Sequence, residues 1–170
     1  YYLPYMARYK VVELQFIKSG CLLGNTAEIK VADQSLFAEG SGTKEDPYII
    51  NSANQLTNLQ YRPLSYIEID RNVSTLTMSG TWTPLERFGG VLDGNNVTIS
   101  NIALGTNPKT TEGGRIFQYS SLFETLLAGA EIRNLNLIYN TSVGYSNSPY
   151  SNDIYLAGVA VTNKGIIDNV

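Results

Sequence analysis

A short motif recurs three times in the second half of this 170-residue chain, and it constrains the fold more than any other feature. The motif is Ile-x-Asn followed by an aliphatic residue; its asparagines are Asn101, Asn134 and Asn169, separated by 33 and 35 residues. A unit of this kind, repeated at a near-constant interval, indicates an architecture in which successive units stack. The surrounding segments are short and rich in Tyr, Thr, Val and Ile, which favours strands over helices. The motif therefore predicts a β-solenoid of stacked parallel strands.

The three asparagines have a defined role in such a stack. Equivalent positions of neighbouring strands lie about 4.8 Å apart, so we expect Asn101, Asn134 and Asn169 to form a ladder at one corner. Asparagine tolerates the left-handed backbone conformation that a corner needs, and its amide can bond to the asparagine of the next unit. The alternative is that they are three unrelated turn residues in an asparagine-rich chain.

Two further elements precede the repeats. Residues 9–18 and 27–32 alternate apolar and polar side chains on either side of a glycine-bounded loop, which predicts a β-hairpin. Ser52 and Gln55 have the spacing of a helix capping box, and they predict a short helix over residues 52–60 that Pro63 terminates. The turn-forming run before Pro47 predicts a boundary, so that residues 1–36 either end a preceding domain or form a flap on the domain after them.

Composition excludes several classes of function. The chain has no histidine and one cysteine, Cys21, so it lacks the residues for Ser-His-Asp catalysis, an HExxH zinc site or a disulfide framework. A net charge of -3 argues against nucleic acid as a partner. Charged residues make up only 16%. Low charge suits stacked strands, because identical charges in neighbouring strands would repel each other.

Carboxylates are the remaining candidates for catalysis. Asp70 and Asp93 each follow a predicted strand, and carbohydrate-cleaving β-helices use aspartate pairs as acid and base or as calcium ligands. The chain has no D-x-D cluster, and Asp93-Gly94 is a typical turn pair. We therefore interpret both aspartates as turn residues, and we predict no catalytic residue, no metal site and no cofactor.

Tyrosines in a predicted loop are the better candidates for binding. Residues 105–120 and 140–153 interrupt the repeats, and insertions of this kind often line one face of a solenoid. The second insertion and its flanks carry, among Ser and Asn, Tyr139, Tyr145, Tyr150 and Tyr155. Tyrosine with Ser and Asn is a composition typical of adaptable binding surfaces. The alternative is a solvated loop packed by its own tyrosines, and for Trp82 we likewise favour a core position over sugar stacking.

Several segments, in order, resemble the GLUG-type right-handed β-helix repeat regions of bacterial proteins. Residues 42–50 and 55–59 resemble the G-T-x-x-D-P-Y-x-I opening and its Q-L-x-x-L helix. Residues 66–70, 82–85 and 88–102 resemble the following D-I-D-L, W-x-P-I and F-x-G-x-x-D-G-N blocks, and residues 121–124 and 157–165 resemble its G-L-F-G and G-G-L-V-G-x-N-x-G blocks. Alanine replaces the usual glycine at Ala157 and Ala160, and residues 1–36 lie outside the match.

The resemblance implies a segment of a large secreted or cell-wall-anchored bacterial protein, of the kind found in adhesins and in the stalks of surface proteases such as immunoglobulin A proteases. We therefore expect an all-β protein: a hairpin extension over residues 1–36, then a right-handed parallel β-helix over 37–170, with a helical cap at about 40–64 and rungs over 65–170. Because the chain does not begin with Met and its last rung is cut short, we expect further rungs and domains in a longer protein.

The function expected from these observations is a non-catalytic structural or adhesive module at the bacterial cell surface. It would bind a host protein or glycan through its loops, or act as a stalk. The alternatives are a carbohydrate-active β-helix enzyme and the stalk region of a surface protease.

Overall fold

The computed structural model describes residues 12–14, 27–29, 36–110, 112, 114, 116–140 and 151–170. The chain divides into two compact units, Tyr1–Leu36 and Phe37–Val170. In the first unit, β1 (Val12–Leu14) and β2 (Ala27–Ile29) pair antiparallel with Val12 opposite Ile29, which is the hairpin that the alternating pattern predicts.

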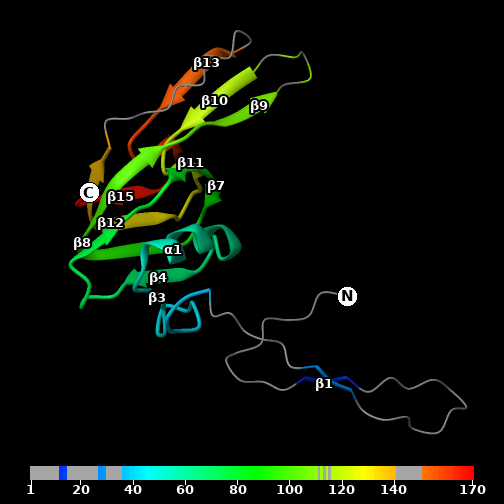
Figure 1. Ribbon diagram of the computed structural model, residues 1–170, viewed down its shortest axis with the longest axis vertical. Coiled ribbons are helices and arrows are strands. Elements are labelled where there is room, and N and C mark those ends of the chain that lie inside the picture. The colour runs from blue at the N-terminus through cyan, green and yellow to red at the C-terminus, as the bar shows by residue number, and fades with distance from the viewer. Residues whose placement is uncertain are drawn as a thin grey trace, which may run out of the picture. The chain divides into compact units, whose positions relative to one another are not determined.

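The second unit is built from β-strands, most of which pair in parallel. Five strands form its first wall in the order β15-β12-β8-β4-β3, and Figure 1 shows them following one another through this unit. Their bounds are β3 Tyr48–Ile50, β4 Tyr66–Ile69, β8 Val91–Leu104, β12 Glu131–Tyr139 and β15 Ile166–Asp168. The register places Tyr48, Ile67, Leu92, Ile132 and Ile167 in one column.

The long strand β8 continues into further walls. Its middle part pairs in parallel with β5 (Thr75–Thr77) on one side and with β12 on the other, so that Leu76, Ile99 and Leu137 share a second column. Its end pairs with β6 (Thr81–Trp82), with Leu104 beside Trp82. A separate parallel sheet has the order β14-β11-β7, formed by β7 (Leu85–Phe88), β11 (Phe123–Leu126) and β14 (Ala160–Asn163).

A third sheet, with the order β13-β10-β9, projects at the top of Figure 1. It contains β9 (Asn107–Thr110), β10 (Ile116–Ser120) and β13 (Ser151–Leu156). β9 and β10 form an antiparallel hairpin, whereas β10 and β13 pair in parallel and lead into β11 and β14. The insertion over residues 105–120 predicted from the sequence therefore includes this hairpin.

Asparagines in the left-handed conformation form the corners between walls. Asn95, Asn96, Asn101, Asn134 and Asn169 have φ between 48° and 62°. In β8 the buried positions alternate as Leu92, Gly94, then Val97, Ile99, then Ile102, Leu104, with one extra residue at each step past an asparagine. The extra left-handed residue turns the strand and keeps the apolar side chains inside after the turn.

The register corrects one prediction from the repeat. Ile132 lies beside Leu92, not beside Ile99, and the column of Ile67, Leu92, Ile132 and Ile167 has spacings of 25, 40 and 35 residues rather than a constant period. Asn101 therefore does not belong to the corner of Asn134 and Asn169. The motif marks a local corner geometry, which β8 uses twice, and the apparent period between Asn101 and Asn134 is not the structural repeat.

A short helical segment follows β3 and covers the interior at that end. α1 (Ala53–Leu56) continues into the 3₁₀ helix η1 (Thr57–Tyr61). At its start, Gln55 Oε1 accepts hydrogen bonds from the backbone N–H groups of Asn51 at 2.8 Å and Ser52 at 3.3 Å, so the glutamine of the predicted box satisfies otherwise orphaned donors. Leu56 and Leu59 are 3% and 2% exposed and point into the interior.

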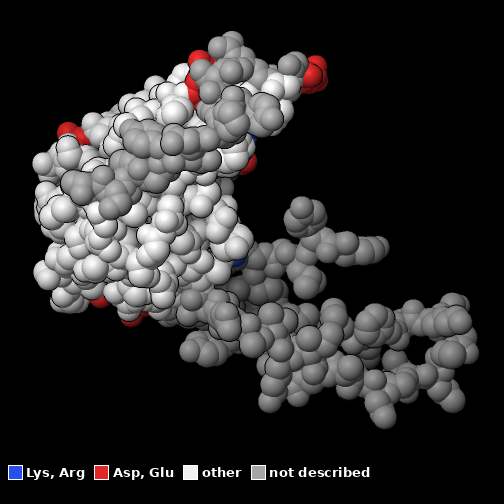
Figure 2. Space-filling model, turned by 45° about the horizontal axis from the view of Figure 1, so that its top comes forward, with Lys and Arg blue, Asp and Glu red and all other residues white. Residues whose placement is uncertain are grey.

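The interior between the walls is apolar and the surface carries few charges. Its fully buried side chains include Phe88, Ile67, Leu92, Leu126 and Ile132. Close approach of successive strands requires glycine at Gly94, since a Cβ there would lie 2.5 Å from the Asn134 carbonyl oxygen. Figure 2 shows a mostly uncharged face with scattered charged groups. Within the described residues, no helix has the length and hydropathy to cross a membrane.

Candidate functional site

The four tyrosines predicted to bind a ligand have different environments. Tyr139 donates a hydrogen bond from its hydroxyl to the carbonyl oxygen of Gly158 at 2.7 Å, and burial raises its pKa to about 12. It therefore ties β12 to the segment before β14. Tyr155 lies on β13 and is 41% exposed. Tyr145 and Tyr150 lie outside the described residues.

Tyr155 belongs to an aromatic cluster on the β9–β10–β13 sheet. Its ring stacks on that of Tyr119 at 5.4 Å between centroids, with an interplanar angle of 15°, and lies 6.0 Å from the ring of Phe117. The register explains this arrangement, because Tyr119 and Tyr155 are direct neighbours in parallel strands. We call Phe117, Tyr119 and Tyr155 the aromatic face.

Polar side chains of β9 lie on the same side of this sheet. Asn107 is opposite Tyr119 and Lys109 is opposite Phe117. Asn107 Nδ2 donates a short hydrogen bond to Glu124, and Lys109 Nζ contacts Glu86 closely and lies 3.8 Å from Glu124 Oε1. The aromatic face is thereby on the side of its sheet that looks toward β7 and β11.

Lys109 also offsets the repulsion between two neighbouring carboxylates, those of Glu86 and Glu124. Glu86 and Glu124 occupy neighbouring positions of the paired strands β7 and β11, where two carboxylates repel each other. The hydrogen bond and the positive charge of Lys109 lower the pKa of Glu86, and the hydrogen bond with Glu86 raises the pKa of Lys109. Glu124 is only 9% exposed. The ammonium group thus neutralises this stacked pair of acids.

A groove lies beside these residues. It has a volume of about 720 Å³ and runs from η1 past β6 and β7 to Asn107 at the start of β9. Its floor is apolar, with Met78, Trp82 and Leu85 each at most 8% exposed. Its rim consists mainly of uncharged polar side chains: Thr57, Gln60, Ser79, Thr81, Thr83 and Asn107. Asn107 lines the groove and is also the strand partner of Tyr119, so the groove and the aromatic face adjoin at this residue.

The predicted asparagine ladder contains different members from those expected. Asn169 Nδ2 donates to Asn134 Oδ1 at 3.0 Å and to Asn96 Oδ1 at 3.3 Å. Asn134 Nδ2 donates to Asp93 Oδ1 at 3.2 Å. Asn101 instead donates to the Met78 carbonyl oxygen and accepts a bond from Asn140 at another corner. Asn96 takes the place expected for Asn101, because the corner of β8 beside Asn134 comes after Gly94.

Asp70 acts as a turn residue, as predicted, whereas Asp93 lies inside β8, just before the corner at Asn95 and Asn96, and not in a turn between two strands. Asp70 Oδ1 accepts bonds from the backbone and side chain of Asn72. Asp93 accepts bonds from the Asn95 N–H at 3.0 Å and from Arg133 Nε at 2.8 Å. Burial alone would raise the pKa of Asp93, but the bonds from Asn95, Arg133 and Asn134 outweigh it and lower that pKa. A carboxyl group with a lowered pKa is a poor general acid, and no group of three potential metal ligands occurs in the described part of the chain.

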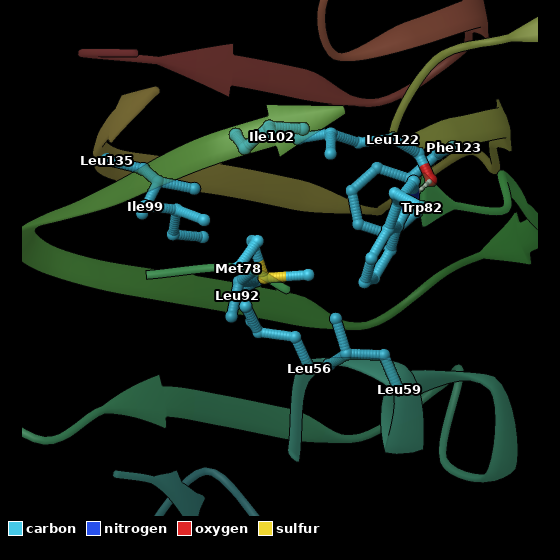
Figure 3. A pocket seen from close by; sticks show the side chains of 10 residues that line it. All are labelled: Leu56, Leu59, Met78, Trp82, Leu92, Ile99, Ile102, Leu122, Phe123 and Leu135. Carbon is cyan, nitrogen blue, oxygen red and sulfur yellow. Dashed lines mark hydrogen bonds between the residues drawn. The ribbon is translucent and has the colours of Figure 1, made fainter. Parts of the chain in front are cut away.

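The interior cavity is too small for a ligand. It measures about 20 Å³ and is lined only by apolar side chains, among them Leu56, Met78, Ile99 and Leu135 (Figure 3). Figure 3 also shows Trp82 beside Leu122 and Phe123 in this interior, with its indole N–H donating to the Leu122 carbonyl oxygen at 3.0 Å. Trp82 is 6% exposed and so belongs to the core, as we interpret from the sequence.

Sequence reasoning missed Phe117, Tyr119 and Lys109. Phe117 and Tyr119 lie two positions apart in a β-rich segment, which places both side chains on one face, and this was the available signal. Their contact with Tyr155 depends on pairing across 36 residues, which alternation within a strand does not determine.

The chain is similar to parts of two much longer proteins. It is 29% identical over 149 residues to a protein of Evansella cellulosilytica described as a Gly-rich membrane protein, covering 82% of this chain and 16% of that protein. It is 30% identical over 148 residues to halomucin of Haloquadratum walsbyi, covering 77% of this chain and 1% of halomucin. No protein-family model matches the chain, and no solved structure matches it significantly. The resemblance to GLUG-type repeats therefore stays a prediction.

Proposed function

We propose that residues 37–170 are a non-catalytic structural and adhesive segment, a right-handed parallel β-helix within a large protein of the cell envelope. The observation that carries this proposal is the column of Tyr48, Ile67, Leu92, Ile132 and Ile167, in which successive turns of the chain stack in register. A stack of this kind can be lengthened by adding turns, which suits a stalk.

The two similar proteins support a place at the cell surface. Their names describe a membrane protein and a halomucin, and this chain matches only a small share of each. A segment that has only 16% charged residues and matches parts of much longer proteins is consistent with a structural part of a larger protein. The stalk of a surface protease remains a variant of the same proposal.

The carbohydrate-active enzyme is the second candidate, and the environment of Asp93 argues against it. Arg133, Asn134 and Asn95 all bond to its carboxylate, which leaves it ionised and engaged. A general acid would need the opposite environment.

Two measurements test the proposal. Antibodies raised against residues 37–170 should label intact cells of the source organism, and the purified chain should release no reducing ends from a panel of polysaccharides. Labelling only after cell lysis would contradict the surface location. Product release that Asp93→Asn or Asp70→Asn abolishes would replace the structural role by an enzymatic one.

A further inference from the structure

The groove and the aromatic face together have the composition of a site for a polar, uncharged chain. The groove has an apolar floor and a volume of about 720 Å³, which is within the range of ligand sites. Its rim supplies hydroxyl and amide groups from Gln60, Thr81 and Thr83, all exposed. A structural stalk does not require either feature.

The charge of this surface restricts the ligand. Glu86 and Arg87 are adjacent and opposite in charge at the groove, and Lys109 is held by Glu86 and Glu124. An anionic polymer needs a surplus of basic groups, which this surface does not present. The balance of charge therefore favours a neutral ligand.

The aromatic face restricts it further. Tyr155 is 41% exposed, and its ring lies parallel to within 15° to the ring of Tyr119 on which it stacks, so the side of the pair away from Tyr119 is formed by Tyr155. Pyranose rings have apolar C–H faces that pack on aromatic rings and hydroxyl groups that bond to threonine and amide side chains.

We propose that this combined surface binds a neutral polysaccharide chain, with a sugar ring packed on Tyr155, which Tyr119 supports by stacking, and the hydroxyl groups bonded along the rim of the groove. The proposal rests on the adhesive part of the proposed function and names its ligand class. The column of Tyr48, Ile67, Leu92, Ile132 and Ile167 does not line this surface, so a failure here would leave the structural role intact.

Affinity electrophoresis of the 170-residue chain tests the proposal, with gels containing laminarin, dextran, mannan or xyloglucan as neutral probes and polygalacturonate as the acidic probe. At least one neutral polymer should retard the protein, and polygalacturonate should not. Tyr155→Ala should weaken retardation about tenfold through the lost ring contact, and Thr83→Ala about fivefold through one lost hydrogen bond.

Thr162→Ala is the matched control, since Thr162 is an exposed threonine of β14, two strands away from β7 in the same sheet. It should bind like the unaltered chain, and circular dichroism should show all variants folded. Absence of binding to every neutral polymer would overturn the proposal, and so would stronger binding to polygalacturonate or to unfolded casein. If Tyr155→Ala and Thr83→Ala both bound the polymers as well as the unaltered chain does, the site would lie elsewhere on the molecule. Cell-surface labelling is an independent test of the proposed surface location.

Discussion

The apolar side chains near β3 and those near β15 differ in how well they are covered. At the β3 end, α1 and η1 insert Leu56 and Leu59, which are 3% and 2% exposed. At the other end, β13, β14 and β15 are each the last described strand of their sheets, and Ile167 and Val170 are 37% and 47% exposed. Their neighbours in β12, Ile132 and Leu135, are 0% and 2% exposed. The same sequence pattern thus contributes much burial inside the stack and little at this end.

Substitution along one column measures this difference. Ile132→Ala should lower the free energy of unfolding by about 4 kcal/mol because it leaves a buried cavity, and Ile167→Ala by about 1 kcal/mol because its site is already partly hydrated. Urea denaturation of both variants compares them. Equal losses would mean that Ile167 is as well covered in solution as Ile132.

The closed end depends on η1. Leu59→Ala should cost about 3 kcal/mol in urea denaturation, since the leucine fills the interior beside Leu56. Leu64→Ala is the matched control, because Leu64 is 71% exposed and close in sequence, and it should change little. A small effect of Leu59→Ala would show that the helical segment does not close the stack.

The corner asparagines extend the comparison to the backbone. Asn134→Ala should lower the free energy of unfolding by about 2 kcal/mol, from the cost of a left-handed alanine and the lost bond to Asp93. Asn134→Gly should recover about half, since glycine adopts this conformation freely. Asn169→Ala at the open end should cost at most about 1 kcal/mol. If Asn134→Gly were no more stable than Asn134→Ala, the left-handed backbone conformation would not account for the loss.

Much of this architecture follows from the sequence, and the rest depends on pairing over distance. The asparagine motif predicts left-handed corners, and Gln55 predicts the start of the helix, because both act within a few residues. The position of Asn101 and the aromatic face depend on which strands pair. Insertions between the walls make the spacing of paired residues irregular, so a constant sequence period gives the wrong partner for Asn134.

Protonation provides a smaller test. The folded-state pKa of Asp93 is lowered, so its contribution to stability is present above its unfolded pKa of about 4 and is lost as pH falls through the folded value. Arg133→Gln should cost about 1 kcal/mol at pH 7. The difference between this variant and the unaltered chain should shrink in urea titrations below about pH 4. A difference independent of pH would assign Arg133 a packing role only.

The smallest effect concerns the projecting hairpin. Lys109→Met should cost about 0.5 kcal/mol, because the ion pair with Glu86 is largely exposed. The change should nevertheless accelerate hydrogen exchange of β9 amides, which lie at the edge of their sheet. Adding Glu86→Gln to Lys109→Met should restore part of the loss by removing the repulsion from Glu124. Unchanged exchange in β9 would show that Lys109 does not hold the hairpin to β7.

The extra residue at each corner has a consequence for changes in chain length. Inside and outside alternate along a wall, and each corner resets that alternation by one position, much as a reading frame is reset. A deletion of Asn134 alone would remove the corner of β12, because Leu135 and Leu137 would then follow Ile132 in simple alternation on one face of a straight strand. Insertions between the walls, where β9 and β10 lie, leave this frame untouched. The stack can therefore acquire new surface segments without altering its interior.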